Sequence, residues 1–216
     1  MFVGHLAVAL GATRLRPRVP LAALAAAAFG LDLLWPVFVL AGLETVRVDP
    51  GNTAFTPLDF ASYPWSHSLL MSVVWGVAAG AVAARALRSR AAGAIVAAVV
   101  VSHWALDVVS HRPDMPLWPG GPLLGLGLWN SIPATLAVEG AMLTMALALY
   151  VRAVPARDAI GRWAFVALVG FVTFIWATSP FSPPPPNTTA IAAVGLAFGL
   201  LTIPWLMWIE RHRLNR

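Results

Sequence analysis

Seven apolar runs separated by short polar breaks dominate the sequence, and they constrain the fold more than any other feature. A helix needs about 20 predominantly apolar residues to cross the hydrocarbon core of a bilayer. Six of the runs are close to that length or longer, whereas the first suits a tilted or half-inserted helix. The runs cover residues 1–12, 19–43, 66–84, 91–110, 133–151, 162–179 and 188–209.

The composition favours a membrane protein over a water-soluble one. Hydrophobic residues make up 59% of the 216 residues and charged residues only 11%, whereas soluble domains carry about 25% charged residues. The length fits one domain, so we expect a single transmembrane domain over residues 1–216. The predicted fold is all-α, a polytopic transmembrane helical bundle of six to seven helices, with the lipid bilayer as partner.

Arginine supplies all 14 basic residues, and its distribution predicts the orientation of the chain. Every second break holds three arginines, and the other breaks hold one or none. Because basic loops face the cytoplasm, we expect a protein of the inner cell membrane with a cytoplasmic C-terminus and an extracytoplasmic N-terminus. The net charge of +5 comes from these clusters and does not indicate a nucleic-acid partner. The clusters are Arg14, Arg16 and Arg18; Arg85, Arg88 and Arg90; Arg152, Arg157 and Arg162; and Arg211, Arg213 and Arg216.

Histidines and acids lie in or beside the apolar runs, toward the ends that should face outside. Ionisable groups are costly inside a bilayer, so those that are present indicate a functional site. Scattered leftover residues would not all lie on one side. The residues are His5, Asp32, His67, His103, Asp107, His111, Asp114 and Glu139.

The densest pattern is His103-x3-Asp107-x3-His111, whose members share one face if the helix continues through them. Imidazole and carboxylate groups bind Zn²⁺, Mn²⁺ or Fe²⁺, and the absence of cysteine excludes thiolate ligands. We therefore predict a divalent metal ion as cofactor, with Glu139 or Asp114 as general base. The alternative is a His–Asp pair that only locks two helices together. The predicted metal ligands are His5, Asp32, His67, His103, Asp107 and His111.

Two local features refine this prediction. Pro36 cannot donate to the carbonyl of Asp32, so a kink is expected there in the second run. Ser66 precedes His67 at the start of the third run and is the expected N-cap of that helix.

Four of these elements together resemble the bacterial family of membrane-bound metal-dependent hydrolases, over about residues 1–115. They are an N-terminal His in a short apolar helix, an Asp in the next helix, a Ser-His-Ser after a loop, and a His-x3-Asp on a later helix. The corresponding residues are His5, Asp32, His67 with Ser68, and His103 with Asp107.

The sequence departs from the family pattern in two places. Gly30 replaces the first acid of an Asp-x-Asp, and only His67-Ser68 remains at the end of a His-Arg-Gly-x-Thr-His-Ser motif. Either His111 and Asp114 compensate for these two missing ligands, or the metal chemistry of the family has been lost or altered here.

The expected function is metal-dependent hydrolysis at a site that opens to the extracytoplasmic face, with a lipid-like or small-molecule substrate. The alternative is a transporter or permease in which the same residues form a proton relay, or a non-catalytic membrane scaffold. A transporter should continue its polar residues toward the cytoplasmic ends of the helices, where mainly Ser and Thr occur. A haem held by two histidines would leave the acids without a role.

Overall fold

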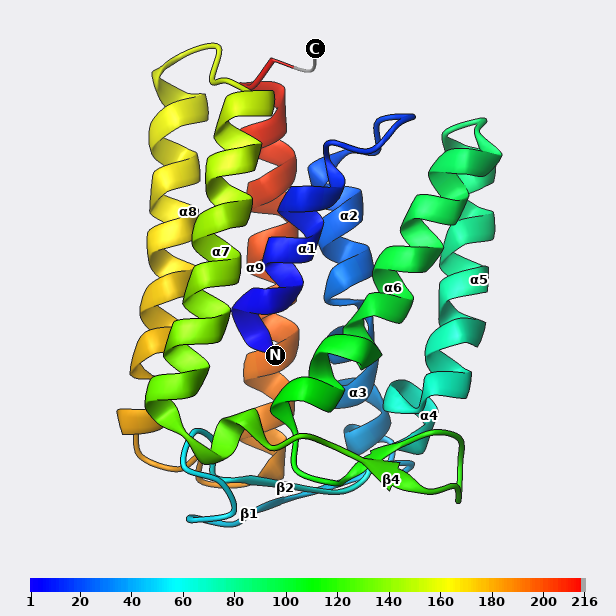
Figure 1. Cartoon of the computed structure of the whole chain (residues 1–216), viewed down its shortest axis with the longest axis vertical. Coiled ribbons are helices and arrows are strands. Elements are labelled where there is room, and N and C mark those ends of the chain that lie inside the picture. The colour runs from blue at the N-terminus through cyan, green and yellow to red at the C-terminus, as the bar shows by residue number, and fades with distance from the viewer. Residues whose placement is uncertain (215–216) are drawn as a thin grey trace.

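Nine α-helices make up most of residues 1–214, the part of the chain that the computed structural model describes (Figure 1). They are α1 (Phe2–Ala12), α2 (Leu21–Ala28), α3 (Gly30–Leu40), α4 (Pro64–His67), α5 (Leu69–Ala86), α6 (Arg90–Ser110), α7 (Ile132–Ala153), α8 (Ala159–Thr178) and α9 (Thr188–Arg211). Two antiparallel strand pairs join β1 (Thr45–Val48) to β2 (Leu58–Ser62) and β3 (Met115–Pro116) to β4 (Leu123–Leu124). The all-α bundle predicted from the apolar runs is confirmed.

Five of the described helices, α5 to α9, are long and apolar enough to cross a membrane. The pair α2 and α3 forms a sixth candidate span that bends by 46° at a break. Of the two helices that remain, α4 has only four residues. The other, α1, has 11 residues, about 16 Å at 1.5 Å per residue, or half of a hydrocarbon core of about 30 Å. In Figure 1 it begins at mid-height in the bundle, so the first run is a half-span rather than a crossing.

The loops divide between two ends of the bundle (Figure 1). One end carries the loops after α1, α5 and α7 together with the end of α9, and these segments hold the arginine clusters as far as residue 214, since Arg216 lies outside the described residues. The other carries both strand pairs and α4. We call them the arginine-rich end and the strand-bearing end. The loops with three arginines thus lie at one end of the bundle and the other loops at the opposite end, as expected. Which side of the membrane each end faces stays a prediction.

The second span breaks at Phe29, not at Pro36 as expected. Phe29 leaves the helical conformation at φ −94° and ψ 4°, whereas Pro36 lies inside α3. A proline is tolerated within a membrane helix where neighbouring groups satisfy the freed carbonyl, so its position alone does not locate the break. The break brings the carbonyl of Ala28 to a partner on another helix, 2.7 Å from His103 Nδ1.

Close packing of α5 on α6 fixes the helix that carries His103 and Asp107. A Cβ atom on Gly80 would lie 2.7 Å from the carbonyl oxygen of Gly93, and one on Gly93 would lie 2.5 Å from that of Gly80. Small residues at these crossings allow the two backbones to approach closely.

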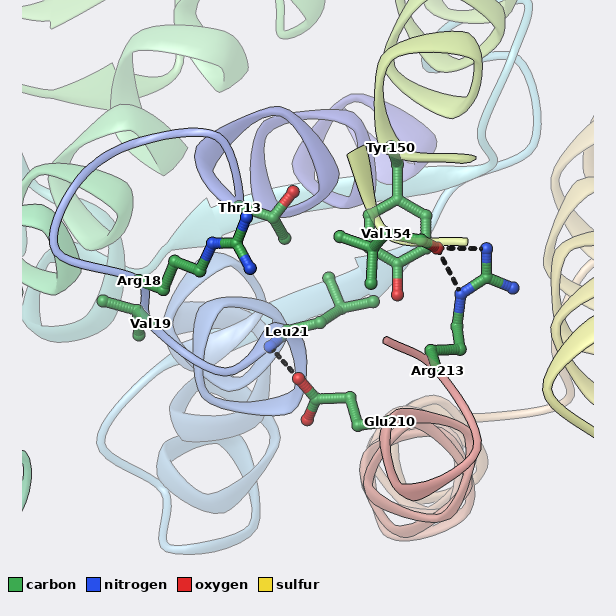
Figure 2. A pocket seen from close by; sticks show the side chains of 8 residues that line it. All are labelled: Thr13, Arg18, Val19, Leu21, Tyr150, Val154, Glu210 and Arg213. Atoms are coloured by element: carbon green, nitrogen blue, oxygen red, sulfur yellow. Dashed lines mark hydrogen bonds between the residues drawn. The ribbon is translucent and has the colours of Figure 1, made fainter. Parts of the chain in front are cut away.

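Polar contacts close the arginine-rich end (Figure 2). The Glu210 carboxylate accepts hydrogen bonds from the backbone N–H groups of Leu21 and Ala22, so it caps the first turn of α2. The Arg213 guanidinium donates to the Val154 carbonyl at 2.6 and 2.9 Å and to the Gly161 carbonyl at 2.7 Å. The end of α9 is therefore tied both to α2 and to the connection between α7 and α8.

Asp158 caps α8 at the same end by accepting from Gly161 N at 2.8 Å. Its second carboxylate oxygen lies 2.7 Å from His212 Nδ1. The hydrogen bond from Gly161, and then the contact with His212, lower the pKa of Asp158 below its ordinary value.

Candidate metal centre

Five of the predicted ligands come together inside the bundle from four helices. Their ligand atoms form two groups that share His103, and within each group the atoms lie within 4.8 Å of one another. The groups are His5, His103 and Asp107, and Asp32, His67 and His103. Residues separated by a hundred positions in the sequence thus form one cluster, which we call the His/Asp centre: His5, Asp32, His67, His103 and Asp107.

His103 is in the middle of the centre. Its Nε2 lies 3.0 Å from Asp107 Oδ2, 3.6 Å from Asp32 Oδ1 and 3.2 Å from Nε2 of His67. His67 Nε2 is itself 3.5 Å from Asp32 Oδ1. The side chains of His67, His103 and Asp107 are at most 5% exposed, whereas that of Asp32 is 40% exposed. Asp32 is therefore the member of the centre that a molecule from outside can reach.

Hydrogen bonds determine which nitrogen of His103 carries its proton. Nδ1 lies 2.7 Å from the carbonyl oxygen of Ala28, and a carbonyl can only accept. The N–H of the neutral ring is therefore on Nδ1, and the lone pair of Nε2 points into the centre.

The proton of His67 is placed by a chain of two hydrogen bonds. Ser66 Oγ donates its only hydrogen to Glu44 Oε2 at 2.7 Å, so it must accept from His67 Nδ1, also at 2.7 Å. The lone pair of His67 Nε2 then faces that of His103 at 3.2 Å. Two opposed lone pairs beside two carboxylates require a cation between them, either a shared proton or a metal ion.

His5 joins the centre from α1. Its ring stacks on that of His103 with 3.7 Å between centroids and 4° between planes, and its Nε2 lies 3.1 Å from Asp107 Oδ1. The amino group of Met1 donates to the same oxygen and lies 3.3 Å from His5 Nε2. Asp107 is therefore shared: Oδ1 faces α1, and Oδ2 faces the two opposed imidazoles.

The sequence interpretation missed Glu44. This acid follows α3 and is 3% exposed, and its Oε1 accepts from the backbone N–H groups of Trp65 and Ser66 at 2.8 Å each. Nothing in its local sequence marks it, because its partners lie twenty residues later. Ser66 is likewise not an N-cap as expected: α5 is capped by Ser68, which accepts from Met71 N, and the Ser66 hydroxyl serves His67 instead.

His111 and Asp114 belong to neither metal group, because α6 ends at Ser110 and His111 continues in an extended conformation with ψ 152°. His111 Nδ1 lies 3.0 Å from Asp114 Oδ1, and the Tyr63 hydroxyl donates to that oxygen at 2.8 Å. Burial, reinforced by Asp114, raises the pKa of Tyr63 well above its ordinary value, so its hydroxyl remains a donor. Arg112 also contacts Asp114, at 3.4 Å.

Glu139 of α7 lies beside the beginning of α1. Its Oε2 accepts from Val3 N at 3.1 Å, and its Oε1 has no hydrogen-bond partner within residues 1–214. A carboxylate at this position accepts a hydrogen bond from a free N–H group of the first turn of α1. Its negative charge also interacts favourably with the positive, N-terminal end of the helix dipole. The structure therefore gives Glu139 a role in positioning α1 and His5, and its role as general base stays a prediction.

A cavity of about 400 Å³ borders the centre. Asp32, His67, Asp107 and His111 are among its lining residues, and most of the others are apolar or aromatic, many of them from α3, β2 and α9.

Comparison of the chain with protein-family models, with curated proteins and with solved structures finds no significant match. Membership of the membrane-bound metal-dependent hydrolase family therefore stays a prediction from the quoted motifs.

Proposed function

We propose that this protein is a membrane-embedded, metal-dependent hydrolase whose divalent ion is bound by Asp32, His67, His103 and Asp107. One observation carries the proposal, namely that the lone pairs of two tautomer-fixed imidazoles oppose each other at 3.2 Å beside two carboxylates. Nitrogen and oxygen donors in this ratio suit Zn²⁺, Mn²⁺ or Fe²⁺. Each ring also donates its other N–H to a fixed acceptor, which is the usual support of a metal-bound histidine.

When bound, a divalent ion supplies Lewis-acid activation of water and of a carbonyl or phosphoryl oxygen. The protein's own groups supply the rest. Asp32 is the carboxylate on the accessible side of the centre, and His5 holds the opposite oxygen of Asp107. His111, whose Nδ1 faces Asp114, lines the same cavity and provides an imidazole base there. The general base expected at Asp114 would thus act through His111.

The topology of the loops supports a site on the extracytoplasmic side of an inner membrane. His67 lies on α4 at the strand-bearing end, opposite the arginine clusters (Figure 1). By the positive-inside rule the strand-bearing end is the outer one. A proton relay for transport uses the same groups but requires a polar path toward the arginine-rich end.

Metal content provides the direct test. The detergent-purified protein is stripped with chelator, reloaded with Zn²⁺, Mn²⁺ or Fe²⁺ and analysed for bound metal, alongside His103→Ala and the matched control His212→Ala. We expect one ion per centre in the wild type and in the control, and its loss in His103→Ala. A reloaded wild type without metal, or a His103→Ala variant that binds as the wild type does, refutes the proposal in favour of a proton-sharing scaffold or relay.

Activity is measured on the same samples with chromogenic carboxylic and phosphate esters. Hydrolysis that requires the reloaded metal and disappears in His103→Ala supports the hydrolase. Metal binding without hydrolysis of either ester class in the loaded wild type contradicts the hydrolytic part of the proposal.

A further inference from the structure

We propose that the cavity beside the His/Asp centre binds the hydrocarbon chain of a membrane amphiphile, which enters sideways from the bilayer. This inference rests on the proposed function and deepens it, because it names the substrate class and its route to the centre. The occupant is one chain of a bilayer lipid or of a lipid-like substrate.

The lining of the cavity combines a few ionisable groups with many apolar side chains. Asp32, His67, Asp107 and His111 line this cavity, and the first three of them belong to the His/Asp centre. Most of the other lining side chains are apolar or aromatic, among them Phe29, Leu33, Trp35, Ile191 and Phe198. A volume of about 400 Å³ lies within the range of about 300–1,000 Å³ for ligand pockets, which are mainly apolar with a few placed polar groups. A chain in the apolar part would present its polar linkage to Asp32.

The rim of the cavity lies on membrane-spanning helices. Val194 of α9 lines the cavity and is 69% exposed, and Ile175 of α8 lines it and is 36% exposed. Both helices are candidate membrane spans, so the exposed sides of these residues face lipid chains rather than water. The apolar part of the cavity is therefore continuous with the lipid-facing surface of the bundle.

A neighbouring cavity explains why the occupant is an amphiphile rather than a plain hydrocarbon. Phe60 and Tyr63 line this cavity and also a second one of about 640 Å³ at the strand-bearing end. The second cavity is lined by charged residues, including Arg47, Asp59 and Arg112. A molecule with a chain in the first cavity has a charged, water-facing space next to its polar end.

Entry past the rim is tested by photolabelling. The protein is reconstituted in phosphatidylcholine vesicles that contain a diazirine-tagged palmitoyl phosphatidylcholine, and the labelled positions are mapped by mass spectrometry. We expect labels on Phe29 and Trp35, which line the cavity but are at most 8% exposed. Ordinary contact with lipid cannot reach these two buried side chains.

A bulky side chain introduced at the rim, compared with one introduced elsewhere on the same helix, tests the entry route. Val194→Trp should lose most of the labelling of Phe29 and Trp35, whereas Leu200→Trp should keep it, because Leu200 is on the same helix and 77% exposed but does not line the cavity. Ile191→Trp, another substitution in the lining, guards against a folding defect of the first variant. Unlabelled buried residues in the wild type, or equal labelling in all three variants, overturn the inference.

Metal content is recorded for every sample, so the two proposals fail separately. A wild type that holds metal but shows no label on the buried lining refutes chain binding and leaves the hydrolase intact. Labelling of Phe29 and Trp35 that is lost in Val194→Trp, in a protein that binds no metal, supports the chain site and refutes the metal centre.

Discussion

Replacing Glu44 by Gln should reverse the tautomer of His67 without removing any side chain of the His/Asp centre. Two backbone N–H groups donate to Glu44 Oε1, so the amide oxygen of Gln takes that position and its NH₂ group faces Ser66 Oγ. Ser66 then accepts from the amide and turns its hydrogen toward His67 Nδ1. The ring keeps its proton on Nε2, where the metal would bind.

The magnitude follows from the hydrogen bonds that must be broken. To present a lone pair at Nε2, the Glu44→Gln variant has to leave one buried donor of the chain unpaired, which costs about 1–3 kcal/mol. Because about 1.4 kcal/mol corresponds to a tenfold change in affinity, the affinity for Zn²⁺ should fall about 10–100-fold, the range found when outer partners of metal ligands are changed.

The assay is competition for Zn²⁺ against a chromogenic chelator in detergent. It is run as a double-mutant cycle with Ser66→Ala, since Ser66 is the link between Glu44 and His67. In the Ser66→Ala background, Glu44→Gln should have little further effect on affinity. If it instead weakens Zn²⁺ binding equally in both backgrounds, the hydrogen-bond chain does not set the tautomer and the reasoning is wrong.

Three further predictions concern the framework and are measured by unfolding in detergent. Gly80→Ala should destabilise the protein by about 1–3 kcal/mol, because its Cβ would lie 2.7 Å from a carbonyl oxygen of α6, whereas Gly170→Ala, with open space around its Cβ, should not. Glu210→Ala should cost about 1–3 kcal/mol by uncapping α2, and an unchanged midpoint would contradict this role. Since the fold lowers the pKa of Asp158, the stabilising effect of its carboxylate should be complete above the ordinary pKa of 3.8 and be lost as the pH falls further. The difference in stability between the wild type and Asp158→Ala should therefore vanish at low pH. A difference that persists there would disprove the assignment.

The candidate site could be predicted from the sequence because its residues are ionisable groups within segments that are otherwise apolar. His5, Asp32, His67, His103 and Asp107 are ionisable groups in or beside apolar runs, and the cost of such groups in hydrocarbon marks them one by one. Their distribution over the runs also indicated a common depth.

Other features escaped because they depend on contacts or on where a helix ends. The row of residues from His103 to His111 assumed a continuous helix, but α6 stops at Ser110 and the chain turns His111 toward Asp114. Glu44 belongs to a loop by its sequence, and its function arises only when Ser66 packs against it. The break in the second span occurs at Phe29, where the freed Ala28 carbonyl meets His103, and not at the residue whose chemistry suggested a kink.

The sequence by itself determined that the chain is an all-α membrane bundle and which polar residues are out of place in it, because apolar length and the cost of a buried charge are properties of a segment taken alone. Only the tertiary structure decided that His67 and His103 oppose their lone pairs and that a cavity lined mainly by apolar residues borders the His/Asp centre. These depend on distances between segments far apart in the chain, which packing sets and which no local pattern contains.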